Sequence, residues 1–134
     1  MSDLQTNELR HAILSKHSTN HLESSENFET LVRQHEDSLH PEGGVQQGII
    51  EEMVIDYWRM RRFSAIENGM MNQALDGTSP DADKMTRLID AQSSLTDNHR
   101  YNLLNLYEDR CHRRYYRALN CMLAISRRQD KKEK

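Results

Sequence analysis

Residues 76–83 read DGTSPDAD, and this stretch separates two long segments whose apolar residues follow helical spacing. Glycine, proline, serine and aspartate favour turns, each through its own backbone chemistry. Asp81 or Asp83 is placed to cap the next helix, because an aspartate accepts hydrogen bonds from the free N–H groups of a first turn. Two helices joined by a short turn lie antiparallel, since neither buries its apolar stripe alone. We therefore predict a long helical hairpin around this turn.

Apolar residues recur every three or four positions on both sides of the turn. The first segment runs from Val45 to Leu75, and the second covers residues 83–128. This spacing predicts two α-helices that face each other through a narrow apolar seam. Residues 96–98, which read TDN, interrupt the second segment, and we expect a kink or a break there.

The seam of the hairpin has aromatic residues that are expected to anchor it. They are Tyr57, Trp58, Tyr107 and Tyr115. If the turn is centred near Ser79, residues equally distant from it face each other. Trp58 should then lie near Tyr101, and Ile49 near Asp109.

A shorter helix is expected ahead of the hairpin. Ser24 and Ser25 offer an N-terminal cap, and the early acid Glu26 suits the positive end of a helix dipole. The helix must end near His40, because Pro41 disfavours a helical conformation in the residue before it. Two glycines then follow.

These elements predict an all-α protein in which a short N-terminal helix packs on a long antiparallel hairpin, as in a three-helix bundle. A chain of 134 residues has room for a single domain. We place this domain at residues 24–128. Residues 1–23 are expected to be a flexible segment and residues 129–134 a solvated tail.

Composition and cysteine usage indicate a soluble cytoplasmic protein. No run of about 18 apolar residues is present, and the first residues contain no apolar stretch typical of a signal peptide. Cys111 and Cys121 lie on one predicted helix, which separates their Cα atoms by roughly 15 Å. That distance is too long for a disulfide, so free thiols are expected, as is usual in the cytosol.

Charge is distributed unevenly along the chain, although the net charge is only −3. Residues 1–57 have eleven acids and three bases, whereas residues 97–134 have ten bases and five acids. Such polarity has two explanations: the two ends attract each other, or the basic end serves an anionic partner.

The stretch RCHRRYYR (110–117) is the centre of the basic end. Arg110, Arg113, Arg114 and Arg117 stand at i, i+3, i+4 and i+7, which places them on one helical face. This arginine stripe, together with Arg127 and Arg128, could contact the phosphates of a nucleic acid. We favour the other interpretation, in which the stripe pairs with acids of the same chain. Those acids are Glu29, Glu36, Glu42, Glu51 and Glu52.

No motif in the sequence indicates catalysis, a cofactor or a metal. There is no nucleophile elbow, glycine-rich phosphate loop, HExxH or CxxC. Glu108 and His112 stand at i and i+4, but a zinc site needs three or four converging ligands. We therefore expect this pair to be structural and the protein not to be an enzyme.

Several short motifs resemble those of a family of small bacterial helical proteins of uncharacterised function. They are NELRHAILSK (7–16), HPEG (40–43), YWRMRR (57–62) and RYYRAL (114–119), in this order. The chain departs from the family at Ala12, where the family has glycine. The resemblance implies a helical fold and a bacterial origin, and it implies no activity.

A three-helix arrangement with this many methionine and aromatic residues leaves an apolar flank open, which association would cover. We therefore expect a non-catalytic helical interaction protein that self-associates or binds a protein partner, and no membrane. The alternative is an accessory protein that binds nucleic acid through the arginine stripe.

Overall fold

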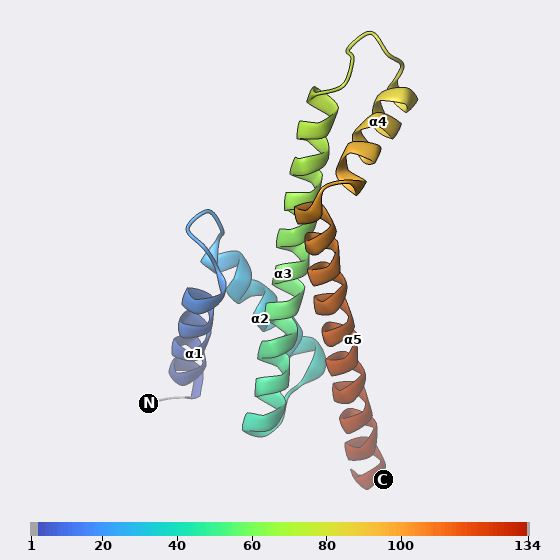
Figure 1. Cartoon of the computed structure of the whole chain (residues 1–134). Coiled ribbons are helices and arrows are strands. Elements are labelled where there is room, and N and C mark those ends of the chain that lie inside the picture. Colours follow the sequence, from blue (N-terminus) through green and yellow to red (C-terminus); the bar gives the residue numbers. More distant parts are fainter. Residues whose placement is uncertain (1–2, 134) are drawn as a thin grey trace. The chain divides into compact units, whose positions relative to one another are not determined.

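The computed structural model describes residues 3–133 of the chain and the side chains of residues 7–132. The described residues form five α-helices and no β-strand, which confirms the prediction of an all-α protein (Figure 1). The helices are α1 (Asp3–Ser18), α2 (Ser25–Leu39), α3 (Gly43–Asp76), α4 (Lys84–Thr96) and α5 (His99–Glu133). None of them is long and apolar enough over the described residues to cross a membrane.

Helix α2 begins and ends where the sequence predicts. The hydroxyl of Ser24 accepts a hydrogen bond of 3.1 Å from the backbone N–H of Asn27, so Ser24 is the N-terminal cap. The helix ends at Leu39, and His40 adopts a left-handed conformation with φ of 48°. Its backbone N–H still donates to the carbonyl of Glu36, which closes the last turn.

The turn and the predicted interruption are also confirmed. Helix α3 ends at Asp76, and Asp83 caps α4 by accepting a hydrogen bond of 2.8 Å from the N–H of Thr86. The hydrogen bonds from Thr86 lower the pKa of the Asp83 carboxyl from its ordinary value. Helix α4 ends at Thr96 and α5 begins at His99, so the expected kink is a complete break.

The N-terminal region contains a helix over Asp3–Ser18, within the residues 1–23 that were expected to be a flexible segment. The face of α1 that includes His11 and Ser15 is buried, whereas Leu9 and Ile13 are about half exposed. The face of α1 that packs on the protein thus combines the polar residues His11 and Ser15 with Leu14, which contacts the core. At the other end, α5 continues to Glu133, into the expected tail.

The described helices divide into two compact units. The single domain expected over residues 24–128 stays a prediction. The first unit consists of the described parts of residues 1–58 and 113–134, and the second unit is residues 59–112. The boundaries fall inside α3 and α5, so both units have a part of each of these helices.

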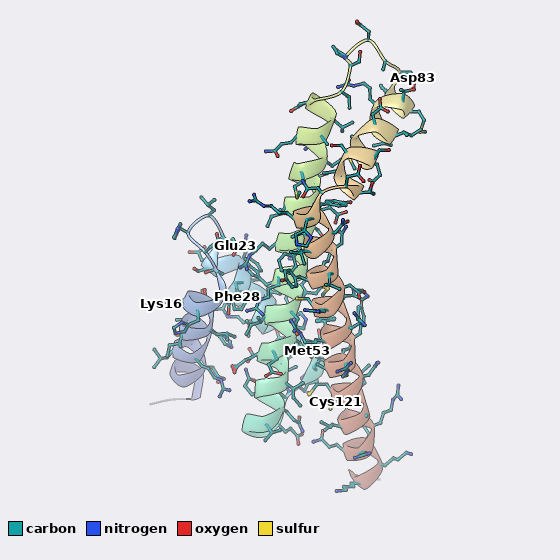
Figure 2. All side chains as sticks on the ribbon, viewed as in Figure 1. Lys16, Glu23, Phe28, Met53, Asp83 and Cys121 are labelled. Carbon is teal, nitrogen blue, oxygen red and sulfur yellow. The ribbon has the colours of Figure 1, made fainter. Side chains whose placement is uncertain are left out.

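The first unit has a continuous apolar core. Its buried members come from α2, α3 and α5, and they are Phe28, Leu31, Val32, Ile50, Met53, Val54 and Met122. Phe28 and Met53 are labelled in Figure 2. The ring of Phe28 meets the ring of Trp58 edge to face, with centroids 5.4 Å apart. Full burial of side chains of this size stabilises a fold by roughly 1.5–3 kcal/mol each.

The second unit is paired in a different register from the predicted one. The hydroxyl of Tyr101 donates to Glu67 over 3.4 Å, and the rings of Phe63 and Tyr107 lie 6.5 Å apart. Tyr101 was expected near Trp58, so the second arm of the hairpin (residues 83–128) is displaced along α3 from its predicted pairing. The displacement arises because this arm is not one continuous helix: α4 and the break at residues 97–98 come before Tyr101.

Candidate functional site

Within the first unit, Arg114 of the arginine stripe has an acidic partner that the sequence did not suggest. Its Nη2 and Nε lie 3.0 Å and 3.2 Å from Oδ1 of Asp56. Asp56 is only 8% exposed, although it stands between the apolar positions of α3. An acid inside an otherwise apolar stripe was the signal that could have pointed to this pair.

The acids that were expected to pair with the stripe are in contact with other residues. Glu51 accepts from Nε and Nη2 of Arg10 at 2.7 Å and 2.8 Å. Glu36 contacts His11 and accepts a hydrogen bond from Gln47, and Glu42 accepts one from Gln129. Glu29 and Glu52 have no ion pair among the described side chains. Arg114 therefore has a partner, Asp56, that was not among the predicted acids.

Helix α1 contacts two of these acids, Glu51 and Glu36, through its polar side chains Arg10 and His11. The Arg10–Glu51 hydrogen bond raises the pKa of the Arg10 guanidinium from its ordinary value. Nε2 of His11 lies 2.9 Å from Glu36, while its Nδ1 is buried without a hydrogen-bond partner among the described side chains. Such contacts fix the position of a helix with little apolar burial.

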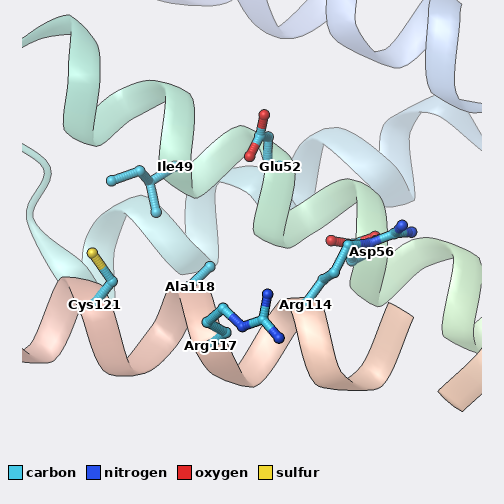
Figure 3. Close-up of a pocket in the computed structure, with 7 residues that line it drawn as sticks. All are labelled: Ile49, Glu52, Asp56, Arg114, Arg117, Ala118 and Cys121. Carbon is cyan, nitrogen blue, oxygen red and sulfur yellow. The ribbon is translucent and has the colours of Figure 1, made fainter. Parts of the chain in front are cut away.

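A shallow groove of 310 Å³ runs between α3 and α5 in the first unit (Figure 3). It is lined by Ile49, Glu52, Asp56, Arg114, Arg117, Ala118 and Cys121. The ion pair of Asp56 with Arg114 lies along it, and Arg117 has no ion pair with any described side chain. The charge of Arg117 in this groove is thus available to an anion, such as a carboxylate.

The other arginines named from the sequence lie along α5. The guanidinium of Arg110 lies 5.8 Å from the centre of the Tyr107 ring, in the second unit. Arg113 is exposed, as are Arg127 and Arg128 near the end of α5. Neither Arg127 nor Arg128 makes an ion pair with a described residue.

Three of the expected seam anchors gather in the first unit. Nδ1 of His35 lies 2.9 Å from the carbonyl of Leu31 and donates to it, so Nε2 accepts the hydroxyl of Tyr115 over 3.0 Å. The Tyr57 ring lies 5.4 Å from that of Tyr115. Burial, and then the neighbours Tyr57 and Tyr116, raise the pKa of Tyr115 from its ordinary value. The anchor Trp58 instead donates its indole N–H to Glu23 over 3.1 Å.

Two carboxyl groups come together in the second unit. Glu67 of α3 accepts from Tyr101, and Glu108 of α5 accepts from the hydroxyl of Ser64 over 2.9 Å. Burial, and then the negative charge of Glu108, raise the pKa of Glu67 from its ordinary value. This pair was not predicted, because it depends on a register of α3 and α5 that differs from the expected one.

Metal-ligating side chains are not clustered in the described part of the chain. No group of three or more His, Cys, Asp or Glu side chains is placed to hold a metal ion among the described residues. Both cysteines are free thiols, as predicted, with Cys111 buried and Cys121 exposed.

Large apolar side chains are exposed in the second unit. On α4, Met85, Leu88 and Ile89 are 64%, 45% and 57% exposed. Ile66, Leu106 and Tyr107 of the same unit are each more than 40% exposed. These exposed apolar side chains come from α3, α4 and α5 and are the apolar surface of the second unit.

Comparisons with known proteins give no relative from which a function could be transferred. No protein-family model, curated protein or solved structure matches the chain.

Proposed function

We propose that the chain is a non-catalytic helical interaction protein, which acts by self-association or by binding another protein. The observation that supports this proposal is the apolar surface of the second unit. Single exposed apolar residues are ordinary on proteins, but a group at helical spacing is typical of a contact surface. The three α4 residues Met85, Leu88 and Ile89 form such a group.

The balance between buried and exposed residues in the second unit supports the same proposal. Its buried apolar side chains are Ala91, Leu95, Tyr101 and Cys111. The exposed ones are Ile66, Met85, Leu88, Ile89, Leu106 and Tyr107. A unit that exposes more large apolar side chains than it buries gains stability when another surface covers them.

The finer description of the architecture belongs to this proposal. In the first unit, the short helix α2 packs on α3 and α5, and α1 contacts α2. We also propose that the chain belongs to the family of small bacterial helical proteins and is cytoplasmic. The motif resemblance supports the first of these, and the two thiols without a disulfide support the second.

Analytical ultracentrifugation over a concentration series tests the proposal, together with capture of partners from an extract of a bacterial cell. Self-association appears as a sedimentation coefficient that rises with concentration. A chain that stays monomeric and captures no protein through this surface would contradict the proposal.

A second candidate function is binding to nucleic acid, and the arginines without acidic partners support it. Arg117, Arg127 and Arg128 make no ion pair among the described residues and could contact phosphates. Replacing all three with alanine should then weaken oligonucleotide binding and reduce its dependence on salt. The matched control is Arg33→Ala, an exposed arginine on α2. Equal binding by the triple variant and the control would exclude this candidate.

A further inference from the structure

A hollow of 320 Å³ lies between the end of α3 and the first turns of α4 in the second unit. It is lined by two leucines and two cations, which are Leu75, Lys84, Arg87 and Leu88. No acid is among these lining residues. The walls of the hollow therefore combine apolar surface with positive charge, and this combination determines the chemistry of what binds there.

Arg87 is held at the hollow by hydrogen bonds to uncharged groups. Its Nε donates to the hydroxyl of Thr78 over 2.9 Å, and its Nη2 donates to the carbonyl of Leu75 over 3.1 Å. A guanidinium has five N–H groups, so three remain for another acceptor. Arg87 makes no ion pair with a described side chain. The carbonyl end of α3 offsets its charge only in part, so Arg87 is already in place to receive an anion.

Lys84 brings a second positive charge to the hollow. It is exposed and stands one helical turn before Leu88. Asp83 and Asp90 flank the two cations in the sequence, but neither acid forms an ion pair with Lys84 or Arg87 in the described structure. The carboxylate of Asp83 instead accepts a backbone N–H as the cap of α4. The two cations therefore have no carboxylate partner among the described residues of their unit.

Exposed apolar side chains continue from the hollow along α4. Met85, Leu88 and Ile89 stand at i, i+3 and i+4, so they project from one side of the helix. Each of them is more than 40% exposed. An occupant of the hollow thus meets positive charge near the beginning of α4 and apolar surface beside it.

From these observations, and resting on the proposed function, we propose that the hollow and the adjoining side of α4 bind an acidic amphipathic helix of a partner protein. A carboxylate of that helix enters the hollow and accepts hydrogen bonds from Arg87 and Lys84. Its apolar side chains, one turn away, pack on Leu88 and Ile89. A helix laid along a groove in this way is a common mode of peptide recognition.

Charge and shape favour this occupant over the others. A carboxylate matches the planar N–H groups of a guanidinium, and it can accept two hydrogen bonds from them at once. A nucleic acid has the charge but no apolar side chains to cover Met85, Leu88 and Ile89. Sites for small molecules enclose most of the ligand, whereas this hollow has only four lining residues. A second copy that presented the same surface would bring like charges together.

Nuclear magnetic resonance titration of the full chain tests the inference, with methyl signals of Leu75 and Leu88 as reporters. The probe is a synthetic amphipathic peptide of about 15 residues, or four turns of helix, with leucines on one side and glutamates beside them. A second peptide has lysine in place of each glutamate, and a third has glutamine in place of each leucine. We expect only the first peptide to shift both signals in a saturable manner.

Lys84→Glu is the variant that locates the binding. Lys84 is the first residue of α4, its side chain makes no hydrogen bond with a described residue, and glutamate is favourable in the first turn of a helix. The variant should therefore fold and bind the acidic peptide about fivefold more weakly. Lys16→Glu is the matched control, because it changes the net charge equally at an exposed lysine of α1 in the first unit. It should leave the affinity unchanged.

The outcomes separate this inference from the proposed function. Equal binding of the acidic and lysine peptides, or equal weakening by Lys84→Glu and Lys16→Glu, would overturn the inference but leave an apolar contact surface standing. No binding of the acidic peptide would also overturn it, and sedimentation and partner capture would then decide the proposed function alone.

Two further arms identify a different occupant. Shifts of the Leu75 and Leu88 signals on dilution of the chain alone would assign the hollow to a second copy. Tighter binding of octanoate than of the acidic peptide would assign it to a small anionic amphiphile. Either result would overturn the inference.

Discussion

Nη2 of Arg114 lies 3.0 Å from Oδ1 of Asp56, a residue that is only 8% exposed. One turn later on α5, Arg117 has no ion pair with a described residue. Two arginines of one helical stripe therefore have different roles in the first unit: one compensates a buried negative charge, and the other faces a groove.

We expect Arg114→Ala to lower the free energy of unfolding by about 1–2 kcal/mol, because it leaves the Asp56 carboxylate without its cation. Arg117→Ala is the matched control and should change it by less than about 0.5 kcal/mol. Urea unfolding followed by circular dichroism measures both variants. Equal losses at the two positions would contradict these separate roles.

The partner of Arg114 could not be predicted because it depends on register. The spacing of the arginines predicts that they share one face of a helix. The residue opposite them depends on how many residues separate them from the turn that joins the two arms of the hairpin, and on whether those residues are helical. The break at residues 97–98 was recognised, yet its effect on pairing was not. The same shift brings Glu67 to Tyr101 and Glu108, which sequence reasoning missed.

Glu67→Gln should stabilise the second unit at neutral pH. The pKa of Glu67 is raised in the folded state by burial and by Glu108, so folding favours its protonated form. Such a group contributes stability at pH below its unfolded pKa, and this contribution is lost as pH rises through the folded pKa. Glutamine is uncharged at every pH, so the variant does not lose this stability as pH rises.

The gain should be less than about 1 kcal/mol at pH 7, because the pair is partly solvated, and it should vanish near pH 4. Thermal unfolding at the two pH values measures it. Glu29→Gln, a change in the first unit, should not reproduce the pH-dependent difference. A destabilised Glu67→Gln at pH 7 would show that the charged form is the one the fold requires.

The attachment of α1 should depend on ion pairs. Glu51→Gln removes the charge that Arg10 contacts at 2.7 Å, so the amides of α1 should exchange with solvent faster. High salt should act in the same direction in the wild type, because it screens partly exposed pairs. Hydrogen exchange resolved by mass spectrometry measures both effects.

The neighbouring Glu52→Gln is the matched control, since Glu52 makes no ion pair with a described residue. It should leave the exchange of α1 unchanged. If Glu51→Gln also leaves it unchanged, apolar contacts such as that of Leu14 with the core hold the helix instead.

Helix α2 should depend on its N-terminal cap. Ser24→Ala removes the acceptor of the Asn27 N–H, which should cost about 1 kcal/mol of unfolding free energy. Ser24→Asp retains an acceptor and should be close to neutral. Thermal or urea unfolding compares the two variants, and an equal loss in both would mean that the serine does more than cap.

The contrast between α2 and α1 shows which features a sequence can reveal. Ser24, Asp83 and His40 act through local backbone chemistry, so the helix ends that they define were predictable. Helix α1 packs through His11 and Ser15, and its exposed Leu9 and Ile13 give an apolar pattern that points to the wrong face. Polar docking of this kind depends on partners that are distant in sequence.

The two cysteines should differ in reactivity, because both are free but only Cys121 is exposed. A thiol reagent such as a maleimide should modify one site per folded chain quickly and the second only on unfolding, since Cys111 is 3% exposed. Cys121→Ser should remove the fast reaction, whereas Cys111→Ser should leave it. Mass spectrometry of samples taken at successive times counts the modified sites. Fast modification of both cysteines in the folded chain would mean that α5 opens around Cys111, and that the second unit is less stably closed than its buried residues indicate.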